Sequence, residues 1–391
     1  MEEDIGKASV TLLDAAGVDF TYLGPKENCC GTPMLVGGKW DIFLNNMKRN
    51  IASVKACGAD TVITSCPACD MMWRHIYPQW AKKHGIEFDI KTRHYSQIIS
   101  EQIREDKFRY THEVNKKVTW HDSCHMGRVS GIYDPPRDMI KAIPGIKFEE
   151  MEYNREDAHC CGSVLTLLKE PLVAHDVGDI RIKEAEEIDA EAILALCPCC
   201  EFQLRVSADK KGKAIGVHDL AAFACLGLGK KFKDPEPEVT RQWAVFEGMI
   251  ALMTPQGFAN LMSSMWPELI NAMPMGMGGM MRFVGKLGPL GGALLWMMKP
   301  MFPILFPILL PKMMPKVMPA MLERVAEKIP MPDYMKEQMP ELMPKVMDNL
   351  MPKMLPDVVP LIVDPIIDYL RGKQGNRVRL ASGYAGTSGT A

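Results

Sequence analysis

Over the first 230 residues, the pattern of apolar and polar positions switches between the spacing typical of helices and the short apolar runs typical of strands. Apolar side chains recur with helical spacing in three segments, residues 8–16, 40–57 and 71–83. Short apolar runs of the kind found in buried strands occur at residues 18–23, 61–64, 118–120 and 193–196, and a further helix is predicted from Glu201 onward. Strands that alternate with helices indicate parallel βαβ units, so we expect an α/β fold here.

The pattern changes after residue 230. Residues 231–244 are polar and contain proline, as linkers do, and residues 245–370 form a tail rich in methionine and proline, since 23 of the 31 methionines lie beyond residue 240. Prolines recur at every fourth position from Pro303 to Pro319, and methionines from Met331 to Met351. We expect the prolines to break the tail into short helical pieces that form no compact core alone. Residues 371–391 are small and polar, which predicts a disordered C-terminus.

Composition narrows the function. The chain has 391 residues and a formal net charge of -2, so no global charge favours nucleic acid. The sequence Met1-Glu2-Glu3-Asp4 lacks the basic and apolar stretches of a signal peptide. We expect a reducing, cytoplasmic compartment, in which twelve cysteines serve as metal ligands or redox centres rather than structural disulfides.

Nine of those cysteines form a duplicated frame. Two Cys-Cys-Gly triplets, at residues 29–31 and 160–162, are 131 positions apart, and 35 residues separate each from a Cys-x-x-Cys pair. The pairs are Cys66 with Cys69 and Cys197 with Cys200, and Cys124 lies 35 residues before the second triplet. Adjacent cysteines suit clusters in which one thiolate bridges two irons, whereas zinc sites take four ligands and avoid such pairs.

The predicted elements place these residues at one kind of position. Cys66, Cys124 and Cys197 each follow the C-terminal end of an apolar strand, where open α/β sheets build their sites. Both Cys-x-x-Cys pairs open predicted helices, whose N-termini stabilise thiolates. Gly31 and Gly162 are expected to let the backbone turn tightly beside a cofactor.

The frame resembles the Cys-Cys-Gly (CCG) domain family of iron–sulfur oxidoreductases, best known from the B-type and D-type subunits of heterodisulfide reductase. The resemblance covers residues 1 to about 228, as two similar CCG domains at 1–115 and 116–230, and leaves the helical tail unexplained. It implies a non-cubane four-iron four-sulfur cluster in each complete frame. For the second domain the implied ligands are Cys124, Cys160, Cys161, Cys197 and Cys200.

The first frame offers four matching ligands, Cys29, Cys30, Cys66 and Cys69. The family's lone cysteine would fall before Met1, so we expect an upstream in-frame start that encodes a strand and a cysteine. A site with four ligands, or an empty one, stays open as the alternative. D-type members of the family carry a ferredoxin-type cysteine run and B-type members do not; this chain resembles the B type in lacking it.

The resemblance implies an oxidoreductase subunit that transfers electrons within an anaerobic multisubunit redox complex. Its partners would be ferredoxin-type iron–sulfur or flavin proteins, and its acceptor a disulfide, a quinone or an acyl-CoA reductase module. Direct disulfide reduction between two facing clusters is one alternative, and it requires a complete first frame. A scaffold that binds zinc or no metal is the other.

Several residues allow a second interpretation. Cys57 and Cys225 are predicted to be packed thiols, and Cys199 has no assigned role. His121 and His125 flank Cys124, either as a proton relay or as hydrogen-bond partners of the loop and cluster sulfur. For Arg128, balancing an anionic cluster and forming a surface ion pair are equally open.

The tail is expected to attach the protein to an apolar partner or, as a peripheral protein, to the inner face of the cell membrane. Five basic and no acidic residues lie between Asn271 and Leu322, among methionine, leucine, phenylalanine and proline. Its longest uncharged apolar runs, residues 287–298 and 300–311, are shorter than the ~20 residues that a spanning helix needs. Copper binding by the methionines is disfavoured because they form no site-like cluster.

Overall fold

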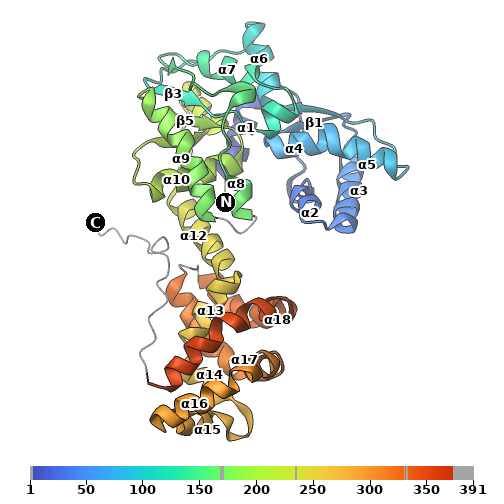
Figure 1. Ribbon diagram of the computed structural model, residues 1–391. Coiled ribbons are helices and arrows are strands. Elements are labelled where there is room, and N and C mark those ends of the chain that lie inside the picture. Colours follow the sequence, from blue (N-terminus) through green and yellow to red (C-terminus); the bar gives the residue numbers. More distant parts are fainter. Residues whose placement is uncertain (1–2, 168–170, 234–235, 330, 332, 373–391) are drawn as a thin grey trace. The chain divides into compact units, whose positions relative to one another are not determined.

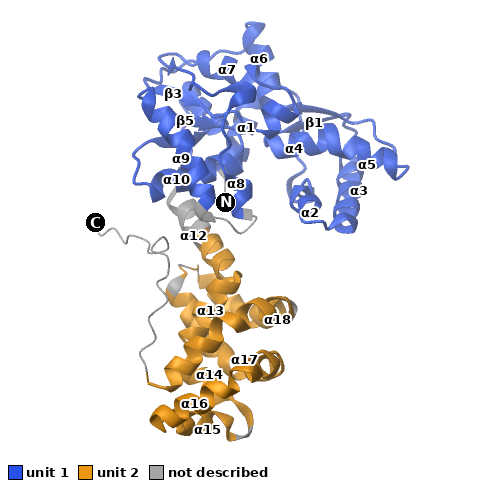
Figure 2. Ribbon diagram, in the orientation of Figure 1, with its two compact units in different colours: residues 1–240 blue, residues 241–391 orange. Residues whose placement is uncertain are grey.

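The computed structural model describes residues 3–167, 171–233, 236–329, 331 and 333–372. The chain divides into two compact units, residues 1–240 and 241–391 (Figure 2). Except for its first two residues, the predicted disordered C-terminus of residues 371–391 lies outside the described range. The two units are described separately below.

Unit 1 contains a four-stranded parallel sheet with the strand order β4-β3-β5-β6. Its strands are β3 (Lys117–Trp120), β4 (Lys147–Phe148), β5 (Ala192–Ala195) and β6 (Gly216–Asp219); β3 and β5 are labelled in Figure 1. Every residue of β5 is buried, as expected for a central strand covered on both faces. A second parallel sheet pairs β1 (Thr61–Thr64) with β2 (Lys91–His94). The parallel α/β arrangement predicted from the sequence is confirmed.

The helices of unit 1 lie between and after these strands. Those before β3 are α1 (Glu3–Ala15), α2 (Thr32–Val36), α3 (Trp40–Ala56), α4 (Pro67–Met71), α5 (Tyr77–Lys83) and α6 (Tyr95–Arg104). Those after β3 are α7 (Asp134–Lys141), α8 (Ser163–Leu167), α9 (Pro171–Glu187), α10 (Pro198–Lys210) and α11 (Leu220–Ala224). Two short π-helical turns are η2 (Met72–Ile76), which continues from α4, and η3 (His125–Val129), which follows Cys124; 3-10 turns form η1 (Gly24–Lys26), η4 (Arg155–Asp157) and η5 (Cys225–Leu228).

The sequence duplication recurs in the structure element by element. A shift of 131 positions, which carries Cys29 onto Cys160, carries α2 onto α8, α3 onto α9 and β1 onto β5 with identical boundaries. One predicted element is wrong: residues 18–23 form no strand, although they follow α1 as expected. Their side chains are exposed or half-buried, and no described strand pairs with them, so the alternating pattern alone was insufficient.

Unit 2 is helical and has its own hydrophobic core. Its helices are α12 (Glu236–Leu252), which begins within the predicted linker, α13 (Pro255–Ser263), α14 (Trp266–Ala272), α15 (Met277–Gly285), α16 (Gly288–Met298), α17 (Phe302–Lys328) and α18 (Asp333–Leu370), with 3-10 turns η6 (Pro274–Gly276) and η7 (Lys299–Met301). Buried side chains from α13, α14, α17 and α18 form one cluster. The expectation that this segment cannot build a core is therefore wrong, because helices that pack together bury the faces that single pieces would expose.

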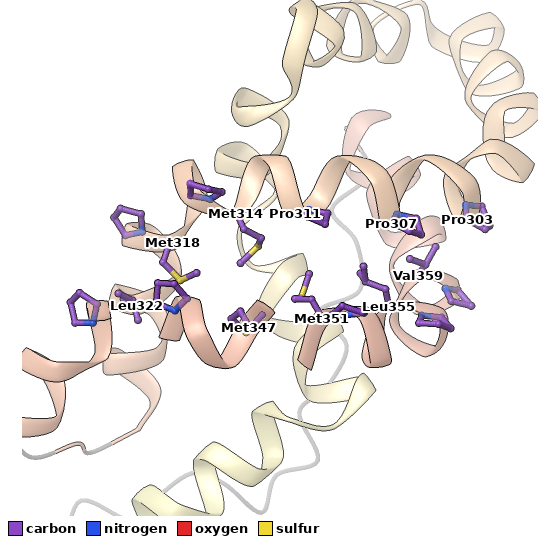
Figure 3. A pocket seen from close by; sticks show the side chains of 17 residues that line it. Pro303, Pro307, Pro311, Met314, Met318, Leu322, Met347, Met351, Leu355 and Val359 are labelled. Atoms are coloured by element: carbon purple, nitrogen blue, oxygen red, sulfur yellow. The ribbon is translucent and has the colours of Figure 1, made fainter. Parts of the chain in front are cut away.

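The prolines do not break the long helices as expected. α17 is continuous through four interior prolines and α18 through six. A spacing of four places successive prolines on neighbouring turns of one face, and the three residues between them keep their N–H donors. Proline rings and methionine, leucine and valine side chains of α17 and α18 line a groove of about 1070 Å³ (Figure 3). Through η7, α16 and α17 form a helical stretch, Gly288–Glu327, that by length and composition could cross a bilayer, which the uncharged runs alone did not predict.

Candidate metal centre

The two Cys-x-x-Cys pairs occupy equivalent strand-to-helix junctions in unit 1. Cys66 is the N-cap of α4 directly after β1, and Cys197 is the N-cap of α10 after β5. Both have extended backbone angles and are followed by a proline at the first helical position, which the helix tolerates because no intrahelical donor is needed there. The second cysteine of each pair therefore lies in a first helical turn, as the sequence predicts.

Cys124 reaches the same edge of the larger sheet from a neighbouring strand. β3 and β5 pair in parallel, with Trp120 opposite Leu194, so the loops after both strands leave the same edge. A buried ion pair holds the β3 loop: Arg137 donates to both carboxylate oxygens of Asp122, at 2.8 and 2.7 Å, and both side chains are 3% exposed. Trp120 Nε1 also donates to Asp122 at 2.9 Å.

Each Cys-Cys-Gly triplet forms the same tight turn. Gly31 and Gly162 both have a φ of 89°, and each donates its N–H to the first cysteine of its triplet, at 3.4 Å to Cys29 Sγ and 3.3 Å to Cys160 Sγ. A Cβ on Gly162 would lie 2.5 Å from the carbonyl oxygen of Ala174. The predicted tight backbone turn is thus present in both triplets, and only glycine fits it without strain.

Three side chains that the sequence did not single out fasten the first triplet. Asn50 donates to the carbonyl oxygen of Cys29 at 3.0 Å and to Tyr77 Oη at 2.9 Å, and Tyr77 donates to the carbonyl oxygen of Cys30 at 2.9 Å. Asn46 also donates to the carbonyl oxygen of Cys29. Asn46 and Asn50 lie on α3, and Tyr77 lies on α5. From the sequence alone, these polar helix residues cannot be distinguished from polar residues that face solvent.

The second frame gathers a compact buried group. The ligand atoms of His121, Cys161 and Cys200 lie within 4.8 Å of one another, and Cys161 Sγ and Cys200 Sγ are 3.3 Å apart, within hydrogen-bond distance. Hydrogen bonds from the Cys160 and Cys200 thiols, with a further one from His121, hold the pKa of Cys161 well below its usual range. The hydrogen-bonding interpretation of His121 agrees with this contact, whereas His125 is outside the group among the described residues.

Thiol contacts continue from the second frame into the first. A hydrogen bond from Cys197, followed by one from Cys69, lowers the pKa of Cys66, although burial opposes the shift. Hydrogen bonds from Cys29 and Cys69 likewise lower the pKa of Cys30. An unbroken series of contacts therefore joins the two frames, and Cys124 lies close enough to Cys161 for their charges to interact.

The three cysteines outside the duplicated frame lie in different surroundings from the frame cysteines. Cys225 is buried, as predicted, and its Sγ lies 3.6 Å from the carbonyl oxygen of Ala8. Cys57, predicted to be packed, is instead exposed because it caps the C-terminal end of α3. Cys199 is exposed and hydrogen-bonds with Cys197 beside the group.

Arg128 makes backbone hydrogen bonds, and its charge also acts on a frame cysteine: burial raises the pKa of Cys124, and the nearby guanidinium opposes that rise. Its Nη1 donates to the carbonyl oxygens of Glu156, at 3.1 Å, and Ala158, at 2.7 Å. It thereby links η3 to the segment that leads into Cys160. Its hydrogen bonds in the described residues hold the backbone before the second triplet.

A parallel α/β scaffold that gathers free thiols at its strand ends is the architecture of a thiolate-bound metal or redox protein. Residues 1–74 and 118–205 match the family model of the CCG cysteine-rich domain, and these two segments belong to that family, as the sequence predicted. The two matched segments contain all nine frame cysteines.

Several curated proteins are similar to this chain. The D-type subunit of dihydromethanophenazine:CoB–CoM heterodisulfide reductase from Methanosarcina acetivorans is 31% identical over 226 residues, which cover 57% of this chain and 54% of that protein. The B-type subunit of fumarate reductase (CoM/CoB) from Methanothermobacter marburgensis is 30% identical over 54% of this chain and 40% of the relative. EtfAB:quinone oxidoreductase of Syntrophomonas wolfei is 30% identical over 50% and 28%. The matched part thus spans about half or less of each relative.

Proposed function

We propose that this chain is an iron–sulfur electron-transfer subunit of a multisubunit redox complex. In this proposal Cys124, Cys160, Cys161, Cys197 and Cys200 hold a non-cubane four-iron four-sulfur cluster. The first frame, with Cys29, Cys30, Cys66 and Cys69, holds a second cluster. The observation that carries the proposal is the duplicated frame of nine free thiols at the strand ends, in which Cys161 and Cys200 lie 3.3 Å apart beside His121.

The donor set fits such a cofactor. Iron–sulfur clusters are held by cysteine thiolates, and all nine frame cysteines are free of disulfide bonds. The five sulfur donors of the second frame exceed the four ligands of a zinc site. A bound cluster supplies one-electron transfer. The protein's own residues supply the shell: Gly31 and Gly162 donate N–H groups to cysteine sulfur, and His121 donates from the buried side.

The contact between Cys66 and Cys197 supports electron transfer between the two groups, because rates of electron transfer are highest over short separations. The donor would be a ferredoxin-type iron–sulfur or flavin protein. The acceptor would be a disulfide, a quinone or an acyl-CoA reductase module. Relatives named for heterodisulfide, fumarate and quinone reactions support this range of partners.

The same contact favours one alternative, direct reduction of a disulfide at the junction of the two frames. That reaction takes two electrons and two protons and converts one disulfide into two thiols. It requires electrons from both groups at one place, which the contact between Cys66 and Cys197 would allow. Reduction of a small disulfide by the isolated, pre-reduced chain would favour this alternative; no turnover without a partner protein would favour electron transfer alone.

The proposal is tested by anaerobic purification of the whole chain, followed by iron, sulfide and zinc analysis and low-temperature electron paramagnetic resonance. We expect iron and acid-labile sulfide with spectra of two distinguishable centres. Stoichiometric zinc without iron would support the scaffold alternative and overturn the proposal.

A further inference from the structure

Exposed apolar side chains concentrate in one part of unit 2, from α15 through α16 to the first turns of α17. Ten large apolar side chains between residues 280 and 308 are exposed, and Trp296 and Met297 are exposed by 70% and 69%. The exposed apolar face is defined by Met280, Phe283, Leu287, Leu290, Leu294, Trp296, Met297, Met301, Ile304 and Ile308. Such concentrations on a protein surface mark a binding surface.

The opposite sides of these helices are already occupied. Leu295 of α16 is fully buried, and Phe306 and Leu310 of α17 are packed in the hydrophobic core of unit 2 with residues of α18. The helices are therefore one-sided: one face holds unit 2 together, and the other presents the exposed apolar face. An apolar cavity of about 350 Å³, lined by methionine, leucine and valine of α15, α16 and η7, opens between them.

The segment that carries this face has charged residues of one sign. Arg282, Lys286, Lys299, Lys312 and Lys316 lie between residues 271 and 322, where the sequence has no aspartate or glutamate. Arg282 donates to Asn271 at 2.6 Å and Lys299 pairs with Asp364 at 2.7 Å, whereas Lys286, Lys312 and Lys316 are exposed. Exposed apolar side chains combined with lysines are complementary to a bilayer with anionic headgroups.

The backbone of α17 favours a position in the membrane interface over a span. Because residues 307, 311, 315 and 319 are proline, the carbonyl groups of residues 303, 307, 311 and 315 lack the N–H donor of the next turn. Each such group is costly in hydrocarbon but is hydrated at the headgroup level. A span would also remove from the core of unit 2 the side chains that α17 buries there.

We propose that unit 2 docks the protein on an anionic lipid bilayer through the exposed apolar face, with α16 and the start of α17 in the plane of the interface. The apolar cavity between α15 and α16 would accept part of an acyl chain. The proposal concerns attachment alone and is independent of whether the cysteines hold iron.

The test uses the full chain, purified anaerobically, in flotation with two kinds of sealed vesicle. One kind is phosphatidylcholine, and the other contains equal amounts of phosphatidylcholine and phosphatidylglycerol. We expect flotation with the anionic vesicles at low salt, and weakening of at least about tenfold as salt screens the lysines. Absence of flotation with anionic vesicles at low salt would overturn the proposal and point to a protein partner for this face.

Matched variants locate the contact. Trp296→Glu should lower the vesicle partition coefficient by about tenfold or more, because it places a charge in the apolar face. Trp40→Glu is the control, since Trp40 is a similarly exposed tryptophan, at 61%, in unit 1. Leu294→Glu and Leu361→Glu form a second pair, with exposures of 40% and 39% on α16 and α18. Equal losses within either pair would overturn the assignment of the face.

Two further readouts test charge and topology. Lys286→Glu should weaken binding to anionic vesicles by about tenfold or more and leave binding to phosphatidylcholine unchanged, whereas Lys353→Glu on α18 should change neither. Protease digestion of peptide tags at both termini, with the protein on sealed vesicles, should remove both tags. Protection of one tag would show a span and overturn the interfacial arrangement.

Discussion

In the first cysteine-rich region the Cys-x-x-Cys loop follows a strand of a two-stranded sheet, and Cys66 and Cys69 are partly exposed. In the second region the equivalent loop follows β5, one of the two central strands of a four-stranded sheet, and Cys197 and Cys200 are buried. The spacing of the cysteines is the same in both regions. Spacing therefore predicts which loops carry the cysteines but not how deeply the fold buries them. The extra strands β3 and β4 supply that burial, and the loop after β3 adds Cys124 and His121.

Equivalent positions also fasten the two triplets differently. Asn50 of α3 hydrogen-bonds the first triplet, whereas Arg181, at the same position of α9, donates to the carbonyl oxygens of Tyr153 and Trp120. Tyr77 has no counterpart in the second region, where the equivalent residue is Ala208. The first region thus binds its triplet directly, and the second holds the strand end from which the neighbouring loop departs.

The largest expected effect would separate the two regions as metal sites. We expect Cys161→Ser to remove the second centre and leave the first, and Cys30→Ser to do the converse, because a serine hydroxyl is a much weaker ligand for iron than a thiolate. Iron and sulfide content, with electron paramagnetic resonance of each reduced variant, would measure this. Cys57→Ser is the control and should keep all the iron, since Cys57 is exposed on the end of α3.

The contact between Cys66 and Cys197 makes the opposite outcome informative. If Cys161→Ser and Cys30→Ser each abolished every iron signal, the two regions would hold one shared centre. In that case the protein would have no separate first and second metal sites to compare. Equal iron loss in Cys57→Ser would mean that the ligands are wrongly assigned.

The next largest expected effect concerns the stability contributed by two ion pairs, which lie at equivalent positions of the two regions. Arg74 pairs with Asp70 at 2.7 Å and Arg205 with Glu201 at 2.6 Å, but the Arg74 side chain is 26% exposed and that of Arg205 only 5%. Arg205→Met should cost about 3 kcal/mol of local stability because it leaves a buried carboxylate without its partner. Arg74→Met should cost less, about 2 kcal/mol, because the Asp70 carboxylate is also buried but water can approach the site that the partly exposed Arg74 side chain leaves.

Hydrogen–deuterium exchange of peptides from α10 and from α4 to α5 would measure the two losses separately, since each reports local opening. Similar losses in both variants would show that the surrounding sheet does not determine how well the ion pair is shielded. Arg109→Met, which removes an exposed pair with Asp106, should leave both peptides unchanged.

Short-range patterns in the sequence were sufficient to predict much of the secondary structure of unit 1 and its sulfur donors. The apolar run at residues 61–64 and the spacing between triplets and pairs predicted β1, the junctions and the sulfur donors. The contact between Cys66 and Cys197 was not predictable, because it depends on how two distant loops pack. Asn50 and Tyr77 were missed for the same reason: each is one polar residue on a helix, and only the fold places it beside a carbonyl.

The tail shows where a local rule misleads. Each proline in the interior of a helix destabilises that helix, so α17 and α18 were expected to be broken. Most of their prolines line the groove between the two helices, and other side chains of both helices are buried in the core of unit 2, which keeps the helices continuous. Residues 18–23 failed in the opposite way, since a strand-like pattern needs a neighbouring strand to pair with.

A third effect compares the glycines of the two triplets. Gly162→Ala should cost about 2 kcal/mol, since a φ of 89° disfavours any Cβ and the nearest atom is the backbone oxygen of Ala174. Gly31→Ala should cost about 1 kcal/mol, because its nearest neighbour at 2.8 Å is the ring of Phe43, which can shift. Exchange in α9 and α3 would measure the losses.

Gly131→Ala isolates the conformational part of that cost. Gly131 has a φ of 68° and no atom within 4 Å of the added Cβ, so its loss reports backbone strain alone. Gly162→Ala should exceed it, and a loss equal to that of Gly131→Ala would show that Ala174 moves away freely.

The smallest effect concerns the hydroxyl group that only the first region has. Tyr77→Phe removes the donor to the carbonyl oxygen of Cys30 and the acceptor for Asn50, and should cost about 1 kcal/mol in exchange of α3. Tyr95→Phe is the matched control, because the buried Oη of Tyr95 has no hydrogen-bond partner among the described residues, so its removal should be neutral or stabilising. If the first triplet is held by this hydroxyl, Tyr77→Phe should loosen α3 and leave α9 unchanged. Equal protection of α3 in both variants would mean that Asn50 and Asn46 alone hold the triplet, and the distinction drawn between the two regions would then rest on their sheets.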